Sequence, residues 1–163
     1  MPELPEVEVS RQGLLPYLPG QHIVDAVFRT RKLRHEIPPS LAARLIGLRV
    51  DAIERRGKYL LFDCESKHGG GWLILHLGMS GSLRLVTPET PVQKHDHVDL
   101  VFVHTTLRFR DPRRFGTLLW HEGNDVERHP LIAVLGIEPL SDGFDGDWLY
   151  GETRRRSAPI KPL

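Results

Sequence analysis

The chain has 163 residues, which is the length of one ordinary domain. Its 22 basic and 21 acidic side chains nearly cancel, and a hydrophobic share of 40% excludes a wholly disordered protein. One cysteine excludes an internal disulfide and a multi-cysteine zinc site, and no apolar run reaches the ~18 residues that a membrane span needs. We therefore expect a soluble, intracellular protein.

The start of the chain predicts a helix over residues 5–18. Pro5 suits a first helical position and Gly20 follows as a stop signal, although Pro16 should end the regular part of the helix earlier. The apolar side chains fall on one helical face, on which Arg11 is the one charged residue. The apolar members of this face are Val7, Leu14, Leu15 and Leu18.

A strand and a short helix are expected next. Residues 22–30 alternate between apolar and polar side chains, which is typical of a strand with one buried face. Ser40 is a favourable N-cap for a short helix that ends at Gly47.

The middle of the chain is rich in predicted strands separated by turn residues. The candidate strands are 48–56, 58–64, 72–78, 82–86, 97–103, 107–110 and 116–120. A final helix is expected from Ser141 or Asp142 to about Arg156. The pattern predicts a mainly β protein with flanking helices, namely an antiparallel β-sandwich of about eight strands with an N-terminal and a C-terminal helix.

The N-terminal residues suggest a nucleophile. Removal of Met1 exposes the secondary amine of Pro2, and an α-amino group titrates near pH 8, so part of it is neutral and nucleophilic at pH 7. Such an amine adds to an aldehyde-like carbon and forms an iminium ion, and the adjacent Glu3 can transfer protons. The alternative is an ordinary start in which acidic residues favour the N-terminal end of a helix.

Basic residues occur in four clusters, although the net charge is only +1. If the clusters converge in the fold, they form a face that binds phosphates; otherwise they are solvated surface. The clusters are Arg29–Arg34, Arg55-Arg56-Lys58, Arg113-Arg114 and Arg154–Arg156.

Five segments, taken together and in order, carry a family resemblance. They are the PELPEVE start, RGKYLL at 56–61, HLGMSGSLR at 76–84, KHDHVDL at 94–100 and DPRRFG at 111–116. This set resembles formamidopyrimidine-DNA glycosylase, the bacterial base-excision repair enzyme for oxidised purines such as 8-oxoguanine and formamidopyrimidines. Leu4 favours this branch over the related endonuclease VIII type, which usually has glycine there.

The resemblance implies catalytic roles for three residues. Pro2 matches the nucleophile that attacks C1′ of the damaged nucleotide as a Schiff base, and Glu3 matches the acid that protonates the sugar ring oxygen. Lys58 matches the lysine that assists base loss and strand cleavage by β,δ-elimination. From the residues alone, the alternative for Lys58 is a strand-edge lysine that discourages aggregation.

The resemblance also implies contacts with DNA. His95 and Arg113 match contacts with the backbone and the opposite strand, and Met79, Arg113 and Phe115 match side chains that fill the space left by an extruded nucleotide. The resemblance assigns a DNA-contacting role to Arg156 as well, but through a less direct match than for the other residues. The residues alone also allow Met79 in the core and Phe115 in ordinary turn packing.

No metal site is expected. His95 and His97 are two positions apart, but a pair of ligands does not make a site, and no cysteine is near. Cys64 alternates with Leu60 and Phe62 and is expected to be a small buried side chain.

The resemblance further implies the domain organisation and the partner. We expect a catalytic β-sandwich domain over 1–150 and a basic tail over 151–163, which in the family leads to a helix-two-turn-helix and a zinc finger that this sequence lacks. The expected chain is a cytoplasmic, nucleoid-associated monomer without a cofactor or a membrane, which binds damaged double-stranded DNA and is impaired as an isolated domain. The alternatives are a non-catalytic DNA-binding or structural fragment and an N-terminal-proline tautomerase, although tautomerases have small βαβ units.

Overall fold

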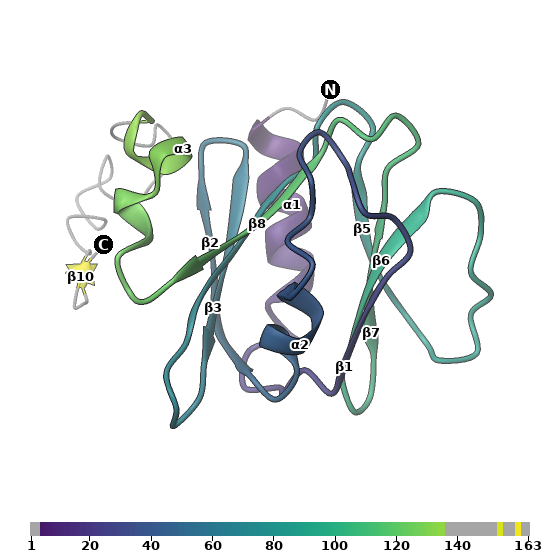
Figure 1. Cartoon of the computed structure of the whole chain (residues 1–163), viewed down its shortest axis with the longest axis horizontal. Helices are drawn as coiled ribbons and strands as arrows, with labels where there is room; N and C mark the ends of the chain where they lie inside the picture. Colours follow the sequence, from purple (N-terminus) through teal and green to yellow (C-terminus); the bar gives the residue numbers. More distant parts are fainter. Residues whose placement is uncertain (1–3, 136–152, 155–158, 161–163) are drawn as a thin grey trace. The chain divides into compact units, whose positions relative to one another are not determined.

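The computed structural model describes residues 4–135, 153–154 and 159–160 (Figure 1). The chain divides into two compact units, Met1–Val126 and Glu127–Leu163. The first unit contains two helices and eight strands among its described residues. They are α1 (Leu4–Leu14), β1 (Asp25–Phe28), α2 (Leu41–Leu45), β2 (Arg49–Arg56), β3 (Tyr59–Glu65), β4 (Gly71–His76), β5 (Ser82–Val86), β6 (Asp96–Val101), β7 (Thr106–Arg110) and β8 (Thr117–Glu122).

The strands form two four-stranded antiparallel sheets. Their orders are β2-β3-β4-β8 and β1-β6-β7-β5. The two sheets enclose one apolar core, and strands of each sheet contribute alternate residues to it. In β3 these residues are Leu60, Phe62 and Cys64. The predicted mainly β architecture of about eight antiparallel strands is confirmed, and so is the burial of Cys64.

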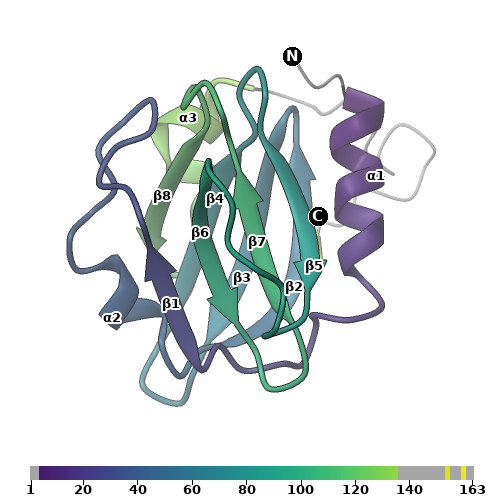
Figure 2. The same cartoon turned by 90° about the vertical axis from the view of Figure 1, so that its right-hand side faces the viewer.

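Each helix of the first unit lies along one open side of the sandwich (Figure 2). Helix α1 contacts β2 and β5, the edge strands on one side, and α2 contacts β1 on the other. Arg44 of α2 also reaches Glu122 of β8, the edge strand opposite β1. Because edge strands present unpaired backbone groups, helices at these positions protect both open sides.

Helix α1 is fastened to β2 by charged groups. Glu8 accepts hydrogen bonds from Arg55 Nε (2.8 Å) and Arg11 Nη1 (2.7 Å), and Arg11 Nε donates to the carbonyl of Ile53 (2.8 Å). Burial opposes ionisation of Glu8, but hydrogen bonds from Gln12 and Arg55 hold its pKa below the ordinary value. The arginine that interrupts the apolar face of the helix therefore serves as a tie to the sheet.

Two predicted helix features differ from the structure. The regular helix ends at Leu14, short of residue 18 and as the position of Pro16 predicts, because proline has no N–H to continue the ladder. Ser40 occupies the N-cap position of α2, but its side chain makes no capping hydrogen bond.

Less of the second unit is described. The 3-10 helix η1 (Val126–Arg128) crosses the boundary between the two units. The second unit also contains α3 (Pro130–Ala133), β9 (Thr153–Arg154) and β10 (Pro159–Ile160). Strands β9 and β10 pair with each other, so two residues of the predicted C-terminal helix form a strand instead. The rest of that helix and the predicted boundary at residue 150 lie outside the described residues. Within the described ranges, no helix is long and apolar enough to cross a membrane.

Candidate functional site

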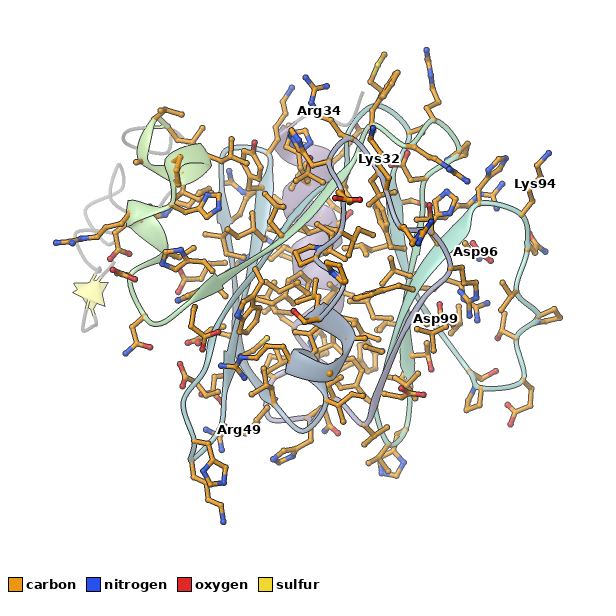
Figure 3. The ribbon with its side chains drawn as sticks, in the orientation of Figure 1. Lys32, Arg34, Arg49, Lys94, Asp96 and Asp99 are labelled. Carbon is orange, nitrogen blue, oxygen red and sulfur yellow. The ribbon has the colours of Figure 1, made fainter. Side chains whose placement is uncertain are left out.

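Several of the sequence-predicted residues lie on loops at one end of the sandwich. In Figure 1 the start of α1 and the β2–β3 turn lie at the upper end, and Figure 3 places Lys32 and Arg34 there, whereas Arg49 is at the opposite end. The loops meet through backbone contacts: the Arg34 N–H donates to the carbonyl of Gly116 at 2.9 Å. This end is the candidate site.

Lys58 lies in the turn between β2 and β3, next to a half-buried histidine. The preceding Gly57 has φ +60°, a left-handed conformation that glycine adopts at little cost. Burial lowers the pKa of His76, and the positive charges of Lys58 and Arg34 lower it further. Since His76 Nδ1 accepts the Gly78 N–H at 3.0 Å, its ring is neutral with the proton on Nε2. Lys58 and Arg34 therefore create a positive field around a neutral imidazole.

The same turn is connected to the start of the chain. Arg55 Nη1 donates to the carbonyl of Gly57 at 3.2 Å, while Arg55 Nε binds Glu8, about one turn into α1. The first helical residue thus lies on the side of the sandwich that carries Lys58. Pro2 and Glu3, the predicted nucleophile and acid, precede this helix and lie outside the described residues, as does Arg156.

Met79, Arg113 and Phe115 are presented together on two loops at this end. Met79 is 43% exposed and Phe115 is 39% exposed, so Met79 is not a core residue. The Arg113 guanidinium lies over the Phe115 ring, 5.3 Å from its centroid. The two loops pack closely because Gly78 has no side chain: a Cβ there would lie 2.5 Å from the Gly116 nitrogen.

His95 and His97 have different environments. His95 directly precedes β6 and has φ +75°, whereas His97 is buried and its Nε2–H donates to the carbonyl of Asp111 at 3.0 Å. Among the residues that the structure describes, no group of three or more His, Cys, Asp or Glu side chains could hold a metal ion. The expectation that the chain carries no metal stays a prediction.

Two residues of this end were not singled out from the sequence. His76 closes an apolar strand and gives no local signal of function, and Arg34 appears only as one member of a basic cluster. Their proximity to Lys58 depends on pairing between β3 and β4 and on the path of the 29–37 loop. The one feature of the sequence that could have pointed to His76 is its position at the start of the HLGMSGSLR segment, which carries the family resemblance.

Comparisons with known proteins agree with this architecture. The profile of the formamidopyrimidine-DNA glycosylase N-terminal domain matches residues 1–118. A formamidopyrimidine-DNA glycosylase from Dechloromonas aromatica is 59% identical over 164 residues, which cover 99% of this chain and 59% of the relative. The chain thus spans about 60% of the length of such curated relatives.

Solved structures of the Lactococcus lactis enzyme are also similar. One is bound non-covalently to DNA that contains an AP site (TM-score 0.67, 36% identity, 74% of this chain and 45% of that chain). Another is in complex with DNA that contains FAPY-dG (TM-score 0.67, 36% identity, 74% of this chain and 44% of that chain). On the sequence match and the shared fold, this chain belongs to the formamidopyrimidine-DNA glycosylase family and carries its N-terminal domain.

Proposed function

We propose that this chain is a DNA glycosylase and abasic-site lyase domain that acts on oxidised purines, including 8-oxoguanine and formamidopyrimidines. The observation that carries the proposal is the grouping, at one end of the sandwich, of the Lys58 turn with the exposed Met79, Arg113 and Phe115. A base inside a duplex must be extruded before its glycosidic bond is attacked, and apolar side chains then replace the lost stacking.

The proposed chemistry begins at the N-terminus. After removal of Met1, the Pro2 nitrogen attacks C1′, the bond from C1′ to the base breaks, and the base leaves with a proton. Glu3 protonates the ring oxygen as the sugar opens to an iminium ion. Loss of a C2′ proton expels the 3′ phosphate by β-elimination, and a second elimination expels the 5′ phosphate. The route uses no metal ion.

Lys58 and its neighbours have two roles in this proposal. Lys58 takes part in proton transfer during base loss and elimination, and its charge with that of Arg34 attracts the flanking phosphates. The four basic clusters of the sequence need not all contact DNA at once. We expect weak binding, with log K falling against log salt at a slope set by about 2–4 contacted phosphates.

Borohydride trapping on duplex DNA with an abasic site tests the proposal. Protein whose N-terminal proline is verified by mass should form a covalent adduct after reduction of the iminium, and Pro2→Gly should form much less. Protein that retains Met1 is the control, because its Pro2 nitrogen is an amide. Equal trapping with Met1 present would remove Pro2 as the nucleophile. DNA binding without any adduct would favour the alternative of a non-catalytic DNA-binding fragment.

A further inference from the structure

We propose that Asp111 is a positioning residue that locks three loops together and so presents the side chains that enter the DNA. The proposal rests on the proposed function, because it assigns a role to a residue behind the same site. Asp111 is not expected to touch DNA: it is fully buried, with 0% of its surface exposed.

One carboxylate oxygen of Asp111 binds a different loop, and the other closes the loop that contains Asp111 itself. Oδ1 accepts the Ser80 hydroxyl at 2.8 Å, and Oδ2 accepts the Gly116 N–H at 2.8 Å. Burial of an ionised carboxylate is unfavourable unless hydrogen bonds compensate, so a neutral residue would serve simple packing at lower cost. The presence of an acidic residue at this buried position is explained by its hydrogen bonds to two donors, one in the 77–81 loop and one in the 111–116 loop.

Ser80 extends this connection to Arg113. Its hydroxyl donates to Asp111 and accepts the Arg113 N–H at 3.1 Å. Ser80 directly follows Met79, so one hydroxyl fixes the backbone beside two of the side chains proposed to fill the vacated space. Phe115 is held from the other side, since the next residue, Gly116, donates to Oδ2.

The backbone of Asp111 restrains the two strained positions of this end. Among the described residues, His95 (φ +75°) and Arg114 (φ +58°) are the non-glycine residues with positive φ. The Asp111 N–H donates to the carbonyl of His95 at 3.0 Å, and the Asp111 carbonyl accepts the Arg114 N–H at 3.2 Å. Such conformations persist only where the surroundings hold them, and they concentrate where preorganisation serves function. Asp111 thus connects the loop of His95 with those of Met79 and Arg113.

Ser80→Ala is the sharpest test, because the chain contains a matched control. Ser66 also donates to a carbonyl (Gly69, 2.8 Å) and accepts a backbone N–H (His68, 3.1 Å), but in a turn at the opposite end. Both serines are partly exposed. Duplexes that contain a stable tetrahydrofuran abasic analogue, with 2-aminopurine on the opposite strand, report side-chain insertion as a rise in fluorescence without requiring catalysis.

We expect Ser80→Ala to weaken insertion roughly tenfold, the usual effect of a lost hydrogen bond to a charged group, and Ser66→Ala to leave it unchanged. Asp111→Asn should lie between wild type and Asp111→Ala, because an amide keeps one acceptor. Covalent trapping on single-stranded abasic DNA, which has no opposite strand to rearrange, should change little in Ser80→Ala.

The outcomes separate this proposal from the proposed function. Equal insertion by Ser80→Ala and Ser66→Ala, or no insertion by the wild-type chain, overturns the positioning role. A loss of insertion in Ser80→Ala but not in Ser66→Ala supports the positioning role, even if the chain forms no covalent adduct with abasic DNA. The missing adduct would count against the proposed lyase activity instead. Equal losses in thermal stability for the two serine variants would strengthen the assignment, since folding would then not explain the difference.

Discussion

The two ends of the sandwich hold their turns in different ways. At the end that carries Arg49, the side-chain contacts of the β3–β4 turn are local: Ser66 bonds to the backbone of His68 and Gly69 within the 66–70 turn. At the other end, the contacts join distant parts of the chain, as between Ser80 and Asp111.

This difference separates two uses of a turn. A turn that closes on itself only has to reverse the chain, and its geometry is independent of its neighbours. Loops that share buried hydrogen bonds are fixed relative to one another, which reduces the ordering cost when they meet a ligand. Paired substitutions at the two ends test whether the loops of the site end are held more rigidly than the opposite turn.

The largest difference is expected from lysines in the two turns that flank β3. Lys58→Gln removes the charge beside His76, and we expect release of an oxidised base and strand cleavage to slow by about 100-fold, as for loss of a proton-transfer group. Lys67→Gln changes an exposed lysine in the opposite turn and should leave the rates unaltered. Single-turnover cleavage assays measure both. Similar rates for the two variants would show that Lys58 has no special role.

A pair of glycines compares backbone packing at the two ends. Gly78→Ala adds a Cβ 2.5 Å from backbone atoms of Phe115 and Gly116 at φ +67°, so strain and overpacking should cost about 2–4 kcal/mol. Gly69→Ala also has positive φ, but nothing lies within 4 Å, and only the conformational strain of about 1–2 kcal/mol remains. Urea unfolding checks both values, and equal costs would contradict close packing of the two site loops.

Asp63, near the end that carries Arg49, is a partly buried carboxyl without the hydrogen bonds to another loop that Asp111 has. Its Oδ1 has no hydrogen-bond partner, and burial, with the negative charges of Glu65 and Asp51, raises its pKa from 3.8 to about 8. The folded state keeps the proton between these pH values and the unfolded state releases it, so stability falls as pH rises toward 8.

Asp63→Asn cannot ionise and should remove this loss. We expect the variant to be more stable than wild type at pH 8, by on the order of 1–2 kcal/mol, with a smaller difference near pH 4. Thermal unfolding across this pH range provides the measurement. A stability difference that is constant with pH would show that Asp63 titrates normally.

The smallest effect is expected in the salt dependence of DNA binding. Arg34→Ala should weaken binding and reduce the magnitude of the slope of log K against log salt by about 1, because one phosphate contact is lost. Arg49→Ala, at the opposite end, should change neither quantity (Figure 3). Fluorescence anisotropy titrations at several salt concentrations measure both. Equal slopes for the two variants would place Arg34 away from the DNA.

The strands were predictable because their signals are local. Alternation with period two and clustered turn residues place most strand ends within two residues of those observed, as for β3 and β5. The end of α1 was predictable from Pro16 but not from the apolar face, which continues to Leu18 although the regular helix stops at Leu14. The buried Leu18 belongs to the chain that follows the helix.

The candidate site was predictable only where residues carry the family resemblance. Lys58, Met79, Arg113 and Phe115 were named from motifs, and the structure places them on loops of one end, while their roles stay predictions. Asp111 was missed because a buried aspartate in a DPRRFG segment gives no indication of its partners. Its contact with Ser80 spans 31 positions and follows from the pairing of β5 with β7, which local patterns do not encode.

Cys64 has a practical consequence for observing these loops. It is the only cysteine in the sequence, it is fully buried in β3, and burial raises the pKa of its thiol to about 12. A thiol that stays protonated and inaccessible at neutral pH does not react with maleimides. A cysteine introduced at an exposed position of the site end, such as Lys32, therefore takes a fluorophore alone. The native sequence is ready for site-specific labelling, and loop movement on DNA can be followed in real time without first replacing a native residue.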